Sequence, residues 1–339
     1  MDLHPSSSPV KAGTTLNARW NPARSLESAA SCRAIRELGM HLARAGFINR
    51  FGRLEIDDDK SRTLAELALG RSIDVADASH FLGGRETTAA LLETGAATAI
   101  EEGRFSLSFE VLSDGKAMAI LPFLDSSTEV PADSVYAGSD TWLLRDHAWK
   151  YGLRGKRALD LGTGTGLVAA FLTSRYETVI ATDLNHRATL TAQLSRELLP
   201  ESARSRMHVV TNDSAAGLLA RSFDFVCVNA PWVPSSRAGG RIYAEGGETG
   251  FELPRRFISD GVELLAPHGI FLGLCAELNF RDGANPLRDL IEGFEHRGFE
   301  ARIDPTPSTH PFFSATDATA ETLPGLLDAR HVTVVVRRL

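Results

Sequence analysis

Between residues 156 and 278 the chain alternates short apolar runs with stretches of helical periodicity, and this alternation constrains the fold more than any other feature. The apolar runs are KRALDLG, TVIATD, MHVVTND, FDFVCVN and GIFLGLCAEL, and helical segments such as RATLTAQLSREL lie between them. Strands separated by helices form parallel sheets with right-handed crossovers. Two later runs, FEARIDP and HVTVVVRRL, have no helix between them, so we expect antiparallel strands at one edge of this sheet.

The composition is that of an ordinary globular protein. The 339 residues are 43% hydrophobic, enough for two domains or one large domain with an extension. A net charge of −7 argues against a nucleic-acid partner. The three cysteines lie far apart, so we predict neither a disulfide framework nor a metal site. No stretch approaches the ~18 apolar residues of a membrane span, and we expect a cytoplasmic protein without a membrane partner.

Changes in pattern divide the chain into three parts. Residues 1–27 are rich in Ser, Pro and Thr and are predicted to be a flexible leader. Residues 28–133 combine helical periodicity with two alternating runs joined around Asp114 and Gly115, which predicts a helical module closed by a β-hairpin. This winged-helix-like arrangement, with its acidic segments, favours a lid or a homodimerisation module over DNA binding. Residues 134–339 hold the predicted sheet.

The run ALDLGTGTGLVAA has the pattern of a ligand-binding turn. Gly162, Gly164 and Gly166 fall between a strand and a helix, with Thr163 among them. Glycines at such a turn let a ligand approach the main chain, and the helix N-terminus offers unpaired N–H groups. The spacing G-x-G-x-G differs from the dinucleotide fingerprint G-x-G-x-x-G, whose glycines serve a pyrophosphate.

Polar residues at neighbouring strand ends extend this turn into a nucleoside site. Asp183, followed by Leu184, can accept both hydroxyls of a ribose. Asn212 and Asp213 end the next strand, where an adenine amino group can be recognised. Asp160 stands just before the glycines, where its carboxylate can meet the amino group of a methionine moiety. Together these positions favour S-adenosylmethionine (SAM), although Asp160 as a turn cap and Asp213 as an Asx-turn residue are the structural alternatives.

The run VNAPWVP ends an apolar strand with groups suited to a methyl acceptor. A planar nitrogen has a delocalised lone pair and attacks poorly unless it is held in line and its developing charge is stabilised. The side-chain oxygen of Asn229 and the carbonyl of Ala230 supply two acceptors for its N–H bonds. Beyond Pro231, Trp232 offers a stacking face. The alternative is that Pro231 ends the strand and Trp232 plugs the sheet edge.

These motifs together resemble the class I SAM-dependent methyltransferases, and in particular the HemK/PrmC-like glutamine N5-methyltransferases, from about Tyr136 to Asn279. The resemblance implies a Rossmann-like, seven-stranded α/β sheet, SAM as cofactor, and Asn229 to Trp232 in the place of the family's acceptor motif. GGETGFELP matches the family's glycine-rich segment, whose positions are Gly246, Gly247 and Gly250, with Thr249 where the family usually has Asp. Ala230 replaces the first proline of the acceptor motif, so the substrate need not be the family's glutamine.

Further residues complete the predicted substrate site. Glu245 and Glu248, together with Glu252, suit a cationic acceptor such as a guanidine or amine, unless they belong to a solvated loop. Trp142 lies within GSDTWLL and Tyr136 lies two residues before it. This run corresponds loosely to the segment that precedes the family's SAM domain. His310 and Phe312-Phe313 are candidates to close the site from the C-terminal side.

Three functions remain open from the sequence. The first is an N-methyltransferase for a small molecule, such as an amino acid or a specialised-metabolite intermediate, which the acidic chain and the altered motif favour. The second is a modification enzyme for a protein glutamine or for an RNA or DNA base. The third is a SAM-fold binding module without activity, against which the intact acceptor motif argues.

Overall fold

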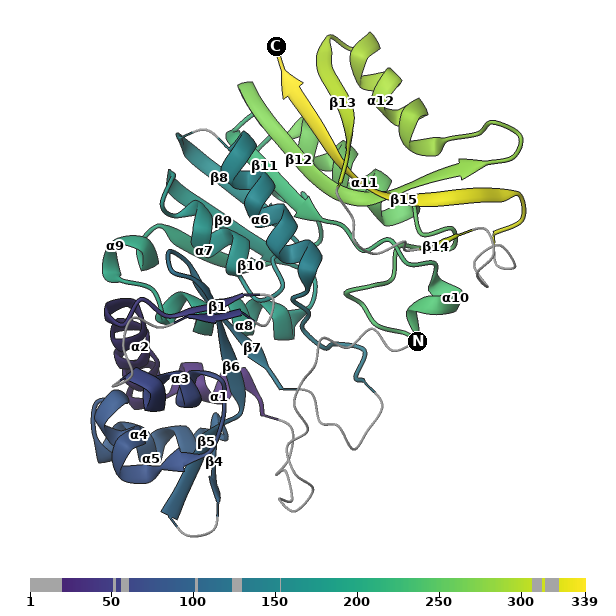
Figure 1. The fold of residues 1–339 in the computed structure, drawn as a ribbon. Helices are drawn as coiled ribbons and strands as arrows, with labels where there is room; N and C mark the ends of the chain where they lie inside the picture. The colour runs from purple at the N-terminus through teal and green to yellow at the C-terminus, as the bar shows by residue number, and fades with distance from the viewer. Residues whose placement is uncertain are drawn as a thin grey trace.

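A computed structural model describes residues 20–50, 53–55, 61–100, 103–123, 130–152, 154–306, 313–314 and 323–339. It contains one large sheet with helices on its faces and an N-terminal module beside it (Figure 1). Among the described residues, no helix is both long and apolar enough to cross a membrane.

The large sheet is the α/β sheet that the sequence predicts. Its strands run in the order β10 (Met207–Thr211), β9 (Tyr176–Asp183), β8 (Gly155–Leu161), β11 (Phe223–Asn229), β12 (Leu265–Phe280), β15 (Leu326–Arg338) and β13 (Phe299–Pro305). The first five are parallel, and β15 runs antiparallel to both β12 and β13. The two-residue strand β14 (Phe313–Ser314) pairs with β15. The antiparallel edge is therefore confirmed, and because the order reverses beside β8, the carboxyl ends of β8, β9 and β11 meet at one edge.

Helices between the strands cover both faces of the sheet. They are α6 (Ser139–Tyr151), α7 (Leu167–Leu172), α8 (His186–Glu197), α9 (Glu201–Arg204), α10 (Ser235–Ala238), α11 (Glu252–Glu263) and α12 (Pro286–His296). One apolar cluster gathers Phe171, Phe225 and Leu272 with residues of α6 and α7, and another gathers Phe271 and Ile258 with residues of α11 and α12. The near-continuous burial along β11 and β12 is typical of strands covered on both faces.

The N-terminal module contains more β-structure than the sequence predicts. Its elements are α1 (Pro22–Glu27), α2 (Ala29–Arg44), β1 (Ile48–Arg50), β2 (Arg53–Glu55), α3 (Arg62–Ala68), β3 (Ile73–Asp74), α4 (Val75–Phe81), α5 (Arg85–Thr94), β4 (Ala97–Ile100), β5 (Arg104–Leu107), β6 (Phe109–Asp114) and β7 (Met118–Pro122). The predicted hairpin is confirmed as β6 and β7, which belong to a four-stranded sheet with β1 and β2. Helix α5 ends at Thr94, because Gly95 adopts a left-handed conformation, and β4 follows.

The last eight residues of the predicted leader belong to this module, and that part of the leader prediction is wrong. Helix α1 begins at Pro22, where the side chain of Asn21 accepts a hydrogen bond from the Ala23 N–H at 3.0 Å. Trp20 is buried and its ring stacks on Phe109 at 5.2 Å between centroids. Residues 1–19 lie outside the described residues.

The module packs against α8 of the large sheet (Figure 1). Leu194 and Leu198 at the end of α8 belong to the module's apolar cluster. The Ile120 N–H on β7 donates to the Ser195 hydroxyl at 2.8 Å. Gly39 on α2 lies so close to α8 that a Cβ there would stand 2.1 Å from the Leu198 carbonyl oxygen. The module therefore shares a packed interface with the half of the chain that contains the large sheet.

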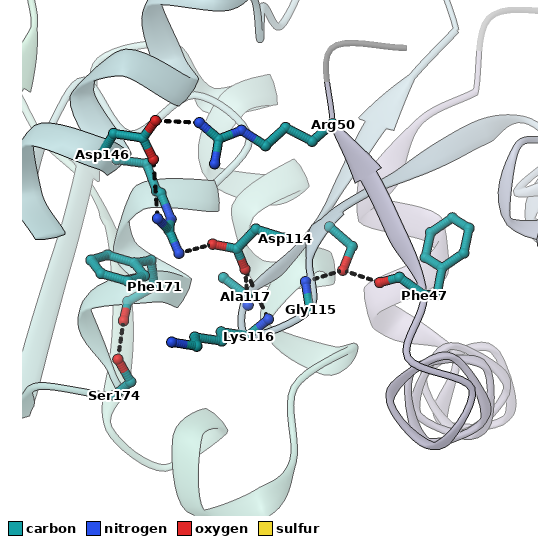
Figure 2. Close-up of polar contacts among 11 residues, drawn as sticks. Phe47, Arg50, Asp114, Gly115, Lys116, Ala117, Asp146, Phe171 and Ser174 are labelled. Carbon is teal, nitrogen blue, oxygen red and sulfur yellow. Dashed lines mark hydrogen bonds and ion pairs between the residues drawn. The ribbon is translucent and has the colours of Figure 1, made fainter. Parts of the chain in front are cut away.

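A chain of charges continues this interface onto α6 (Figure 2). Arg145 of α6 pairs with Asp114 of the β6–β7 hairpin, and the two side chains are 11% and 3% exposed. The other side of Arg145 contacts Asp146 at 3.0 Å, and Asp146 pairs with Arg50 of β1. The second oxygen of Asp114 accepts hydrogen bonds from the main chain of Lys116 and Ala117. One buried carboxylate thus both shapes the hairpin turn and holds α6.

Asp114→Ala is expected to lower the free energy of unfolding by about 3–5 kcal/mol, because it leaves the buried Arg145 without its main counter-charge. Glu86→Ala is the matched control, since Glu86 pairs with Arg33 at 3.0 Å with 82% of its side chain exposed. Urea unfolding of both variants measures the difference. An Asp114 variant as stable as the Glu86 variant would contradict a structural role for the buried pair.

Candidate active site

The glycine loop after β8 adopts the backbone that its sequence requires. Gly162, Gly164 and Gly166 all have positive φ, at 66°, 54° and 81°. A Cβ on Gly162 would meet nothing within 4 Å, so a ligand can approach the main chain there, whereas a Cβ on Gly166 would stand 3.1 Å from the Ala192 Cβ. The Thr163 N–H donates to the Thr182 carbonyl at 2.9 Å and fixes the loop to β9.

Asp160 is buried beneath this loop, with 2% of its surface exposed. One of its oxygens accepts hydrogen bonds from the Thr163 hydroxyl at 2.7 Å and from the Ala169 N–H at 3.1 Å, and the other accepts a weak bond from Cys227. Burial raises the pKa of Asp160 to about 6, because the loss of water disfavours the carboxylate more than these three donors favour it. In this structure Asp160 joins the loop to α7; its predicted contact with methionine remains a prediction.

Asp183 lies at the end of β9 beside the loop. Its two oxygens accept hydrogen bonds from the Gly164 N–H and the Asn185 N–H, both at 2.9 Å. Burial raises the pKa of Asp183, against the effect of these main-chain donors. A carboxylate oxygen accepts more than one hydrogen bond, so both oxygens can also accept ribose hydroxyls. Leu184, next in the chain, is 62% exposed and presents an apolar surface beside this position.

The end of β10 joins the same edge. The Asn212 N–H donates to the Asp183 carbonyl at 2.9 Å, which brings the third strand end against the second. The Asn212 side chain donates to the Ser214 carbonyl, and Asp213 pairs with Arg256 of α11 at 2.9 Å. The structure therefore brings Asn212 and Asp213 to the predicted edge, and it gives Asp213 a partner that the sequence did not indicate.

Asn229 ends β11 with an oriented side-chain amide. Its Nδ2 donates to Asp140 Oδ2 at 2.8 Å, which fixes the way the amide points. Its Oδ1 is buried and accepts no hydrogen bond from any described residue. A buried carbonyl oxygen without a donor costs free energy, so such a group marks a place where a ligand N–H can bind. This is the polar geometry that the predicted acceptor chemistry requires.

Asp140 is the residue that the sequence analysis missed. It lies in the first turn of α6, accepts a hydrogen bond from the Thr141 N–H at 2.9 Å and is bonded by the Tyr136 hydroxyl. Burial and the neighbouring Asp140 raise the pKa of Tyr136, whose ring stacks on Tyr243 at 5.0 Å. Residues 136–140 thus approach the end of β11 from α6. The signal for Asp140 was its position inside GSDTWLL, the segment that the family resemblance matched loosely.

The rest of the NAPW turn, residues 229–232, is held by contacts with β12 and with the glycine-rich segment around Gly246. Ala230 is buried, and its N–H donates to the Leu274 carbonyl at 3.1 Å, so it continues the strand by one residue. Pro231 and Trp232 are partly buried, and Trp232 packs against the apolar cluster that includes α11. A Cβ on Gly246 would stand 2.7 Å from the Trp232 Cα, and the glycines there are needed for this close approach.

The predicted acidic substrate residues have different surroundings. Glu252 accepts hydrogen bonds from the N–H and hydroxyl of Thr249, so both residues shape the turn into α11. Glu245 is partly buried and accepts from the Ser235 hydroxyl at 2.9 Å, and Glu248 is exposed. Because Glu252 and Glu245 have protein donors, these carboxylates give weaker support for a cationic acceptor than their charge alone suggested.

Another predicted substrate residue, Trp142, lies in the apolar core. Trp142 is 4% exposed in the apolar core, with the Arg50 guanidinium 5.2 Å from its ring, on a different face of α6 from Asp140. Its surroundings are those of a core residue. His310 and Phe312 lie outside the described residues, whereas the backbone of Phe313 pairs with Ala329 in β14. Among the residues that the structure describes, no three His, Cys, Asp or Glu side chains gather as metal ligands.

The seven-strand order, the glycine loop and the acidic strand ends define a class I methyltransferase domain. Residues 137–276 match the family model of the methyltransferase small domain. This domain is similar to the HemK/PrmC-like class I methyltransferases, and the match indicates a SAM-dependent methyltransferase. The site fits SAM: the open space at Gly162 and the oxygens of Asp183 are placed to receive its nucleoside.

Three curated relatives are each similar to part of the chain. It is 36% identical to the mouse methyltransferase HEMK2 over 149 residues, which are 39% of this chain and 66% of that protein. It is 29% identical to a release factor glutamine methyltransferase of Gloeobacter violaceus, over 34% of this chain and 44% of the relative. It is 35% identical to the tRNA1(Val) (adenine(37)-N6)-methyltransferase of Pasteurella multocida, over 29% of this chain and 41% of the relative. The chain thus spans less than two thirds of each relative's length.

The Asp160→Asn variant is expected to change how stability depends on pH. In the folded protein the pKa of Asp160 is about 6, above the ordinary 3.8, so the wild type loses stability relative to the variant as pH rises from about 4 to about 6. The loss is about 3 kcal/mol, since each pKa unit corresponds to about 1.4 kcal/mol. Urea unfolding at pH 4 to 7.5 without SAM measures it. A constant difference between the two proteins over this range would contradict the prediction.

Gly246→Ala is expected to displace the NAPW turn, because its Cβ would meet the main chain of Gly250 and Trp232 at 2.6 and 2.7 Å. We expect methyl transfer to fall at least tenfold and stability to fall by about 1–3 kcal/mol, with SAM affinity nearly unchanged. Gly293→Ala in α12 is the matched control, because a Cβ there meets nothing within 4 Å. Equal activities of the two variants would show that the turn tolerates displacement.

Proposed function

We propose that this protein is a SAM-dependent N-methyltransferase that acts on a planar nitrogen. The observation that carries the proposal is the buried Oδ1 of Asn229, which has no donor among the described residues while Asp140 fixes its direction. A carbonyl oxygen in this state binds an N–H group of the acceptor. When bound, SAM supplies an electrophilic methyl group at the edge where β8, β9 and β11 end.

The residues of the turn have separable roles in this proposal. The Asn229 oxygen and the Ala230 carbonyl accept the two N–H bonds of the acceptor, which holds its lone pair in line with the methyl group. Both oxygens also stabilise the positive charge that develops on the nitrogen. The Trp232 ring provides the flat surface against which a planar group stacks. Asp183 and the glycine loop hold the cofactor, with Asn212 and Asp213 at the adenine end.

Among acceptors, the side-chain amide of a protein glutamine is the first candidate. Two of the relatives above are the methyltransferase HEMK2 and a release factor glutamine methyltransferase. An adenine of RNA is the second candidate, because the tRNA adenine methyltransferase is also similar to part of the chain. The net charge of −7 favours the protein, since RNA binding depends on basic surfaces. The comparisons do not support the small-molecule acceptor that the sequence favoured, which becomes the third candidate.

The domain boundaries belong to the proposal as well. We assign methyl transfer to residues 134–339 and a lid or dimerisation role to the module before them. The contacts of the module with α8 and α6 support a fixed position beside the site.

The Asn229→Ala variant tests the function. Transfer of a labelled methyl group is measured to a glutamine-containing release factor, to tRNA, and to free glutamine and arginine. We expect the wild type to methylate one of these, and the variant to lose about 100-fold in kcat, as when one transition-state hydrogen-bonding group is removed. SAM affinity, measured by calorimetry, changes little.

Asn279→Ala is the matched control for this test. Asn279 is a partly buried asparagine on β12 whose Nδ2 donates to Asp328 at 2.6 Å, away from the NAPW turn. We expect it to keep wild-type kcat. Full activity of Asn229→Ala would refute the assigned acceptor site, and absence of transfer by the wild type to all four acceptors would refute the proposed substrates.

A further inference from the structure

The sheet register places His331 at the same edge as Asn229. Asn229 of β11 lies opposite Leu274 of β12, and Leu274 lies opposite Thr333 of β15. His331 is two residues before Thr333, opposite Ala276, so it projects from the same face of the sheet. Because β15 runs antiparallel to β12, His331 lies nearer than Thr333 to the edge where the parallel strands end. His331 is therefore placed beyond the level of Asn229 in the sheet.

Helix α6 covers this face with a row of polar side chains. Asp140 and His147 are seven residues apart and therefore lie on one side of the helix. Asp140 accepts from Asn229 at 2.8 Å, and His147 Nδ1 lies 2.8 Å from the Thr333 hydroxyl. His331 interacts electrostatically with both Asp140 and His147. It is thus enclosed between α6 and the end of β11.

The NAPW turn closes the remaining side. The His331 and Trp232 rings have centroids 6.1 Å apart and are inclined by 38°. His331 is only 7% exposed, although it stands at the edge of the sheet where a substrate must enter. His331 is therefore close to two residues of the proposed acceptor site. Its ring lies beside that of Trp232, and it interacts with Asp140, which bonds Asn229.

From this arrangement we propose that His331 accepts the proton that the acceptor nitrogen releases during methyl transfer. The inference rests on the proposed function. When the nitrogen bonds to the methyl carbon, the carbon–sulfur bond breaks and its electron pair stays on sulfur, which becomes neutral. The nitrogen gains a positive charge and must lose one of its N–H protons. The His331 imidazole takes that proton and afterwards passes it to solvent, so charge and atoms balance.

The surroundings favour the neutral imidazole that this role requires. Burial lowers the pKa of His331, and the charge of His147 acts in the same direction. The Asp140 carboxylate acts in the opposite direction and stabilises the imidazolium once the proton has moved. These are the two titratable groups of α6 that face His331, and the side of β11 presents the uncharged Trp232.

His331→Gln tests the role, with kcat followed from pH 5 to 9. In the wild type we expect kcat to fall as pH drops below 6.5, because a protonated His331 cannot accept the proton. In the variant we expect kcat at pH 7.5 to be lower by about 100-fold and this acid-side fall to disappear. Acceptor KM and SAM affinity should stay within about threefold, which a merely structural loss would not preserve.

His147→Gln is the matched control, since His147 is a partly buried histidine on the same face that bonds Thr333. We expect this variant to keep the wild-type kcat at pH 7.5 and to retain an acid-side fall, moved to higher pH because the charge of His147 no longer lowers the pKa of His331. Wild-type kcat with no fall below pH 6.5 would overturn the proposal without any variant. Normal kcat in His331→Gln beside an inactive Asn229→Ala would overturn it while leaving the proposed function intact.

Discussion

The hydrogen bond between Asn229 and Asp140 is the interaction on which the proposed acceptor site depends. It joins the end of a central strand to the first turn of α6, two segments 89 residues apart. An amide has a donor end and an acceptor end, so an anchored donor leaves the oxygen aimed at the edge of the sheet. Without the carboxylate, the same strand would end in an asparagine of undefined orientation.

Local patterns were enough to predict the strand–turn–helix that carries the proposed cofactor residues. The glycine loop, Asp160 and Asp183 are consecutive features of one strand–turn–helix–strand unit, and their geometry follows from short-range rules of backbone conformation. The alternation of strands and helices likewise predicted the parallel sheet, and two runs without a helix between them predicted its antiparallel edge. Each of these conclusions depends on residues close together in the sequence.

The acceptor half could be predicted only in part, because it is assembled from distant segments. The Asn229 turn was visible as a motif, whereas Asp140 and His331 reach it through the packing of α6 and the register of β15. A shift of one residue in that register would turn His331 to the other face. Trp142 lies in the apolar core for the related reason that two positions along a helix separate it from Asp140 by more than a right angle.

Helix α6 carries different contacts on its two sides. One side presents Asp140 and His147 to the acceptor edge, while the other holds Arg145 against the buried Asp114 of the N-terminal module. A helix is stiff over this length, so the two sides move together. The N-terminal module therefore packs against the same helix that orients the amide of Asn229, and a foreign module in its place would have to supply a buried acid opposite Arg145 to keep that contact.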